Sequence, residues 1–233
     1  MIKHKLFLLS LFLFYGAIAY PYTELQKCDI KKVISRDSTF YYASLVNDYF
    51  MRNYPDPTAN SFVGGKKRNS RIWTRGVYYE GLMSMYRQTP VEKWYDYTQE
   101  WGDFHKWISN DTKAPTNADF HCCGMAYLDM YMLDTLQTIR KTHIKNHIDA
   151  LMYERKSIDD WYWVDAVHMA MPIYAQLGSI ENDDRYFEYM YDMYMFTRDK
   201  QGDTGKSSKG KGKGAPLFNE TDGSGKTAGG YVA

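Results

Sequence analysis

The stretch ADFHCCGMAYLDMYMLD, residues 118–134, decides the fold. It is almost entirely apolar, and this composition over such a length predicts a buried helix. Two further apolar helices are expected to begin near Gly76 and Asp165, so the starts recur about every 45 residues, and amphipathic partners follow. Helix pairs that repeat at this period indicate stacked hairpins, either an α-solenoid or a closed α/α toroid.

Working outward from this stretch, the spacing of apolar residues predicts helices throughout the central part of the chain. The expected helices cover residues 38–52, 76–88, 91–107, 118–134, 139–153, 164–177 and 183–199. No segment alternates with a period of two, so no strand is predicted, and residues 60–70 are expected to form a polar loop. The predicted fold class is all-α.

The composition of the chain argues against some classes of function. The chain has 233 residues and 44% hydrophobic residues, which is ordinary for a globular protein. Lys+Arg 29 against Asp+Glu 28 gives no support to a nucleic acid partner or to an anionic membrane surface. The aromatic share of 17% is high, which fits either stacking surfaces for sugars or an aromatic-rich helical core.

The N-terminus resembles a secretory signal peptide over residues 1–19, with a basic start, a short apolar run and a small-residue site for cleavage after Ala19. The apolar run is too short for a transmembrane helix. The mature protein is therefore expected to be secreted or periplasmic, with no membrane association. Residues 20–199 form the predicted helical domain, and residues 200–233 form a flexible segment rich in Gly and Lys.

No metal or organic cofactor is expected. Cys122 and Cys123 are predicted to be small buried helix residues, because neighbours on a helix point in different directions and cannot share a zinc ion with His121. His143 and His147 lie four residues apart, a spacing that zinc sites use, but no third ligand accompanies them. Both are expected to face solvent.

Two acids stand at the starts of apolar helices, Asp119 and Asp165. An acid there can simply cap the helix and complement its dipole. Asp165 follows Trp161, Tyr162 and Trp163, and partial burial among aromatic rings would favour a neutral carboxyl, which suits a general acid. Two such acids at one mouth of a toroid would form a plausible site for sugar chemistry.

Three blocks of sequence carry a family resemblance: residues 73–82 (WTRGVYYEGL), 117–129 (NADFHCCGMAYLD) and 161–172 (WYWVDAVHMAMP). They resemble the unsaturated uronyl hydrolases, specifically the unsaturated rhamnogalacturonyl hydrolases of glycoside hydrolase family 105, with family 88 as relatives. The resemblance implies an (α/α)6 barrel, of which this chain holds about half. His168 stands where relatives usually carry an aromatic residue.

The resemblance also implies a reaction on the C4=C5 double bond that polysaccharide lyases leave on a uronyl sugar. One Asp protonates C4 and activates a water at C5, and the resulting hemiketal opens and releases the glycosidic bond. Asp165 matches the catalytic acid/base. The implied substrate-binding residues are Asp119, Trp73, Trp163, Met169 and His121. The implied partner is an unsaturated uronyl oligosaccharide from pectin-like polysaccharides, galacturonyl or glucuronyl.

The C-terminal end of the sequence differs from the pattern of the family. Residues 226–233 resemble a remnant of a later family loop of the type W-x-R-G-N-G-W-V, with Thr227 in place of the Arg. A full barrel needs six hairpins, and the chain holds about three and a half. The hypothesis is a truncated product or part of a longer enzyme, and the missing hairpins put the activity of this chain in doubt. The alternative is a non-catalytic helical-repeat protein that binds glycans or proteins.

Overall fold

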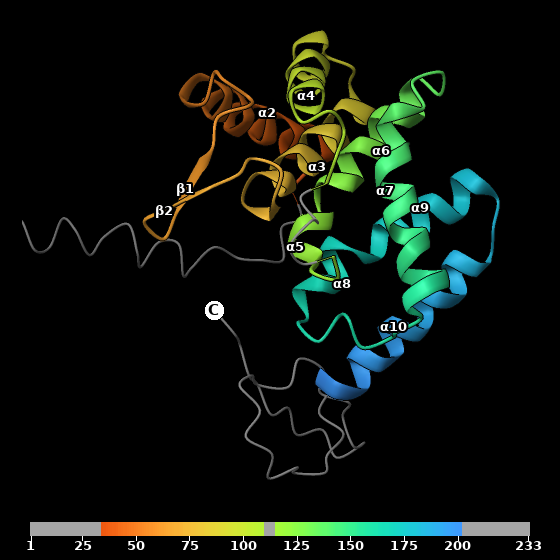
Figure 1. Cartoon of the computed structure of the whole chain (residues 1–233). Helices are drawn as coiled ribbons and strands as arrows, with labels where there is room; N and C mark the ends of the chain where they lie inside the picture. The colour runs from red at the N-terminus through yellow and green to blue at the C-terminus, as the bar shows by residue number, and fades with distance from the viewer. Residues whose placement is uncertain (1–33, 110–114, 202–233) are drawn as a thin grey trace, which may run out of the picture. The chain divides into compact units, whose positions relative to one another are not determined.

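The computed structural model describes residues 34–109 and 115–201 (Figure 1). The predicted signal peptide, Cys28 and the Gly/Lys-rich segment lie outside the described residues. The chain divides into two compact units, Met1–Tyr49 and Phe50–Ala233. Helix α2 (Arg36–Asn53) begins in the first unit and ends in the second. The features that follow lie in the second unit.

The second unit is built from helical hairpins. Helix α3 (Trp73–Gln88) packs against α4 (Glu92–Phe104), α6 (Cys123–Leu133) against α7 (Ile139–Ala150), and α9 (Met171–Glu181) against α10 (Arg185–Gln201). Helix α6 also packs against α3 on one side and α9 on the other (Figure 1). The predicted all-α class is confirmed for the described residues, apart from one short hairpin of strands, and so is the repeat of stacked helix pairs.

Two predicted helices are each divided into a short and a long helix. Residues 118–134 form α5 (Ala118–His121) and α6, while residues 164–177 form α8 (Asp165–Met169) and α9. Pro172 explains the second break, because it has no amide hydrogen to donate to the carbonyl oxygen four residues earlier and its ring clashes with that carbonyl group. After α7 the chain continues as a π-helical turn, η1 (Leu151–Arg155).

The expectation of no strands is wrong at one place. Strands β1 (Ser61–Val63) and β2 (Lys66–Arg68) form an antiparallel hairpin within the predicted loop. Gly64 and Gly65 connect them with positive φ angles of 58° and 71°, the geometry of a two-residue hairpin turn that glycine adopts without strain. Strands of three residues are too short for a period-two pattern to reveal them.

The core lies between the hairpins. Every residue of α6 from Cys123 to Tyr131 is buried, and Cys122 and Cys123 are fully buried free thiols, as predicted. Trp161, Ile144 and Leu177 belong to the same apolar cluster. The close approach of α9 to α10 depends on a small residue in α9, because a Cβ added at Gly178 would lie 2.7 Å from the Phe187 ring of α10. Close packing of this kind fixes the positions from which the site residues project.

Candidate active site

A cavity of about 290 Å³ opens where α5 meets α8. It brings together the beginnings of two successive apolar segments. The residues that line it are Thr116, Asn117, Ala118, Asp119, Asp160, Tyr162, Trp163, Asp165, Ala166 and Met169.

The cavity collects four of the six residues that the sequence proposes for the site: Asp119, Trp163, Asp165 and Met169. Trp73 does not line it. That side chain stands at the start of α3 and is 37% exposed. His121 does not line it either, and this residue is only 1% exposed. The two helix-starting acids therefore share one cavity, and Trp73 and His121 are not part of its lining.

Asp119 is held in place by the turn that precedes α5. The side-chain oxygen of Asn117 accepts a hydrogen bond of 2.9 Å from the Asp119 amide, which is a standard N-cap. Burial raises the pKa of the Asp119 carboxyl, and the negative charge of Asp165 raises it further, while Arg68 lowers it. The two acids are thus close enough to interact electrostatically.

Asp165 is exposed at the first position of α8. This differs from the expectation that aromatic neighbours bury it. Tyr162 and Trp163 are themselves 61% and 56% exposed, with ring centroids 5.5 Å apart. Trp161 turns inward instead and packs edge-on against Tyr174 in the core. The cavity therefore presents an accessible carboxylate beside two open aromatic rings, an arrangement suited to a sugar face.

A third carboxylate lines the cavity, and the sequence interpretation missed it. Asp160 is bound by Arg155, whose Nε lies 3.0 Å and 3.1 Å from the two carboxylate oxygens and whose Nη2 lies 2.7 Å from Oδ1. The Asp160 side chain is only 2% exposed. Because both oxygens are engaged by one guanidinium, this carboxylate is paired with Arg155 and held in a fixed orientation.

The predicted exposure of His147 is wrong. His147 is half-buried, and its Nε2 lies 3.1 Å from Nε2 of His121. Both nitrogens also lie 2.7 Å from the carbonyl oxygen of Pro115. His143 is likewise half-buried, with Nδ1 3.3 Å from the hydroxyl of Ser109. The two histidines on Pro115 support the loop that carries Asn117 and Asp119.

Within the described residues, no cluster of three or more His, Cys, Asp or Glu side chains could hold a metal ion. No helix in that same part of the chain combines the length and apolar character needed to cross a membrane.

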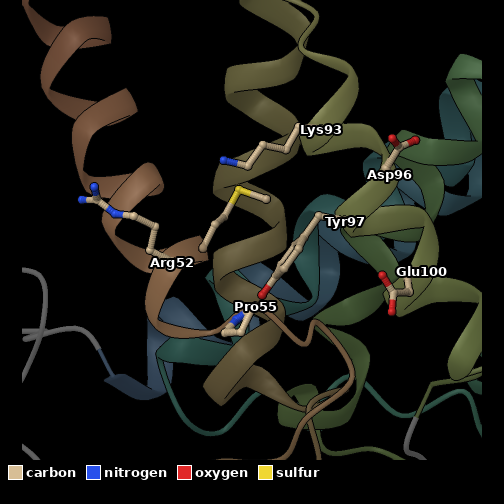
Figure 2. Close-up of a pocket in the computed structure, with 7 residues that line it drawn as sticks. Arg52, Pro55, Lys93, Asp96, Tyr97 and Glu100 are labelled. Atoms are coloured by element: carbon tan, nitrogen blue, oxygen red, sulfur yellow. The ribbon is translucent and has the colours of Figure 1, made fainter.

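A second cavity, of about 390 Å³, lies between the end of α2 and α4 (Figure 2). Two cations, Arg52 and Lys93, and two carboxylates, Asp96 and Glu100, surround Tyr97. The Tyr97 hydroxyl is committed, since it donates a 2.6 Å hydrogen bond to the carbonyl oxygen of Tyr54. Its pKa is raised by burial. None of the proposed site residues lines this cavity, so the cavity between α5 and α8 is the stronger candidate.

Comparison with known proteins relates this architecture to carbohydrate-active enzymes. The family model for Glycosyl Hydrolase Family 88 matches residues 42–223. A solved polysaccharide lyase is similar with a TM-score of 0.62 and 20% identity, covering 72% of this chain and 48% of that one. A glycosyl hydrolase family 88 protein from Bacteroides vulgatus gives a TM-score of 0.62 and 20% identity, covering 71% and 48%.

The chain therefore spans about half of the length of these solved proteins. At this identity the likeness concerns the fold alone. No curated protein matches the sequence.

Proposed function

Since the chain belongs to glycosyl hydrolase family 88, we propose that the cavity between α5 and α8 binds an unsaturated uronyl oligosaccharide and hydrates its C4=C5 double bond. The proposed substrate is a galacturonyl or glucuronyl sugar, as in the unsaturated rhamnogalacturonyl hydrolases that the motifs resemble. One observation carries the proposal: Asp119, Asp165, Trp163 and Met169, predicted from separate blocks of sequence, line the same cavity.

In the proposed reaction, the carboxyl group of Asp165, once it has taken up a proton, donates that proton to C4 of the vinyl ether. The positive charge that develops is shared between C5 and the ring oxygen. A water molecule then bonds to C5 and gives its proton to the Asp165 carboxylate, which restores the acid. The accessibility of Asp165 supports this role, because both the sugar ring and the water must reach one carboxyl group.

The product of hydration is a hemiketal at C5, which opens by breaking the bond between C5 and the ring oxygen. That step leaves a ketone at C5 and a hemiacetal at C1, and the hemiacetal collapses to an aldehyde and the released alcohol. The bond to the leaving sugar breaks without direct attack on C1. The separation rule for retaining and inverting carboxylate pairs therefore does not apply to this reaction.

The remaining cavity residues are proposed to hold the sugar. Asp119 would accept hydrogen bonds from sugar hydroxyls, and its fixed position on Asn117 preorganises that contact. Trp163 offers an exposed ring for stacking, and Met169 would add an apolar contact from the lining of the cavity. The proposed export signal would direct the protein to the compartment in which secreted lyases release such fragments from pectin-like polysaccharides.

The test is the loss of ultraviolet absorbance of the C4=C5 bond when the protein is mixed with an unsaturated galacturonyl disaccharide. Asp165→Asn is expected to reduce turnover at least about 100-fold, because the amide can neither donate to C4 nor take the proton of water. Asp159→Asn is the matched control. Asp159 belongs to the same loop but does not line the cavity, so its variant should retain turnover.

The exposed pair of Tyr162 and Trp163 also favours a second function, glycan binding without turnover. Saturable binding of the disaccharide with unchanged absorbance would support that function and contradict hydration. Turnover that survives Asp165→Asn would contradict the role of Asp165.

A further inference from the structure

The loop formed by residues 156–164 joins η1 to α8 and carries the aromatic side of the cavity. It supplies Asp160, Tyr162 and Trp163 to the lining. Its residues form neither helix nor strand, so no regular pattern of backbone hydrogen bonds fixes their positions. The place of the two exposed rings therefore depends on the contacts that hold this loop.

One contact closes the loop on itself. The guanidinium of Arg155, at the end of η1, binds the carboxylate of Asp160, and Lys156 turns the chain between them with a positive φ of 56°. The ion pair joins two residues that are close in sequence. It shapes the loop but does not tie it to another helix.

Helix α10 provides the ties to another element. The hydroxyl of Tyr189 donates a hydrogen bond of 2.6 Å to the carbonyl oxygen of Ser157. The hydroxyl of Thr197 donates one of 2.7 Å to the carbonyl oxygen of Trp161. Met193, midway between the two donors in sequence, is buried in the core. At a rise of about 1.5 Å per residue, the two donors stand about 12 Å apart along the helix, so α10 holds the loop at two separate points.

The bond from Thr197 acts directly on the peptide group that leads into the exposed pair of rings. The carbonyl of Trp161 and the amide of Tyr162 belong to one planar peptide group, so a fixed carbonyl also fixes the first atom of Tyr162, a residue of the cavity lining. Thr197 and Trp161 are each 1% exposed, so the bond between them is shielded from competing water. The Trp161 ring is held in the core against Tyr174. Residue 161 is thus anchored by both its side chain and its backbone, immediately before the chain presents two open rings.

We propose that Thr197 is a positioning residue that fixes Tyr162 and Trp163 for stacking on the sugar bound in the cavity between α5 and α8. This inference rests on the proposed function and adds to it the contact from α10 that preorganises the aromatic side of the site. Thr197 does not line the cavity and acts only through the peptide group that joins Trp161 to Tyr162. Without its hydroxyl, the loop has to be ordered when the sugar binds, and the free energy of that ordering weakens binding.

This role determines which kinetic constant should change. Asp165 stands at the start of α8, and that helix is held by its contacts with α5 and α9. The chemical step should therefore proceed at close to its normal rate once the sugar is bound. Loss of the Thr197 hydroxyl should then raise KM rather than lower kcat.

The test measures turnover of an unsaturated galacturonyl disaccharide by the full chain. Thr197→Val replaces the hydroxyl with a methyl group of similar size. It is expected to raise KM about 5-fold, the usual effect of losing one hydrogen bond, while kcat stays within about 2-fold of the wild type. Thr197→Ser restores the donor and should return KM to near the wild-type value. Thr98→Val is the matched control and should leave KM unchanged, because Thr98 is equally buried but its 2.9 Å bond to the carbonyl oxygen of Trp94 lies within α4.

Calorimetry with the same disaccharide gives the corresponding change in Kd, and it provides the readout if the wild-type protein binds without turnover. Thr197→Ala also lacks the donor, and it replaces the valine variant if that protein folds poorly. Equal increases of KM in Thr197→Val and Thr98→Val, a serine variant no better than the valine variant, or a loss confined to kcat would overturn the positioning role while the proposed function stands. A wild-type protein that neither binds nor turns over the disaccharide would overturn the proposed function and this inference with it.

Discussion

At the scale of single residues, Asp119 is an acid whose environment is unfavourable to its charged form. Its pKa is raised first by burial and then by the charge of Asp165, with Arg68 opposing them. The folded protein therefore binds a proton at Asp119 more tightly than the unfolded chain does. Stability must fall as the pH rises through the interval between the unfolded value of 3.8 and the higher folded value.

The corresponding prediction concerns Asp119→Asn. The amide carries no charge, so this variant should be more stable than the wild type at neutral pH. The difference should shrink as the pH falls and vanish below 3.8, where the wild-type carboxyl becomes protonated in both states. Urea unfolding of both proteins from about pH 3 to about pH 7 measures the difference directly. A difference that stays constant across this range, or grows toward acid pH, would contradict the assigned environment of Asp119.

At the same scale, Asp119 and Asp165 could be predicted because each follows a local signal, an acid at the start of an apolar segment. Asp160 could not, because its engagement by Arg155 depends on a loop that turns through Lys156 with a positive φ of 56°, which non-glycine residues rarely adopt. His147 was misplaced for a related reason. Its partner His121 lies 26 residues earlier, and helical spacing reveals nothing about a contact between two helices.

At the scale of elements, the helices were predictable from spacing, while their interruptions and the strand hairpin were not. Apolar periodicity does not show that α5 ends at His121, because the segment is buried on all sides and offers no polar face to mark the break. The hairpin depends on the two positive φ angles at Gly64 and Gly65. The flanking strands have only three residues each, which is too short for a period-two pattern to indicate the turn between them. The break after His121 and the turn at the two glycines thus help to position Asp119 of α5 and Arg68 of β2.

Contact between elements gives a prediction at Gly178, where α9 meets α10. A methyl group there would lie 2.7 Å from the Phe187 ring, so Gly178→Ala should destabilise the protein by about 1–3 kcal/mol through overpacking. Gly81→Ala is the matched control, since Gly81 also lies within a helix but has open space around its Cβ position. The control should gain about 0.5–1 kcal/mol from the better helix propensity of alanine. Chemical unfolding measures both, and changes of the same sign would contradict the close approach of α9 and α10.

At the scale of the whole unit, the period of about 45 residues correctly predicted which helices pair, since it places one hairpin after another. The order α3, α6, α9 across the stack follows from that repeat, because each hairpin contacts the next in sequence. The site is a consequence of the same order. Helices α5 and α8 come at corresponding points of successive repeats, so the residues that begin them converge on one cavity.

The stack also predicts how the unit loses structure. In a chain of hairpins, the stability of the whole is the sum of the stabilities of the hairpins and of the interfaces between them. Loss of a hairpin with two neighbours should therefore destabilise more of the molecule than loss of one at the end of the described stack.

Leu128 of α6 and Leu177 of α9 are both fully buried, and truncation of either to Ala should cost about 2–5 kcal/mol. Leu128→Ala should raise amide exchange in all three hairpins together, because α6 contacts both α3 and α9. Leu177→Ala should raise it mainly in α9 and α10 and leave α3 and α4 protected. Hydrogen exchange followed by mass spectrometry separates these patterns, and an effect of Leu128→Ala confined to α6 and α7 would mean that the hairpins are energetically independent despite their contacts.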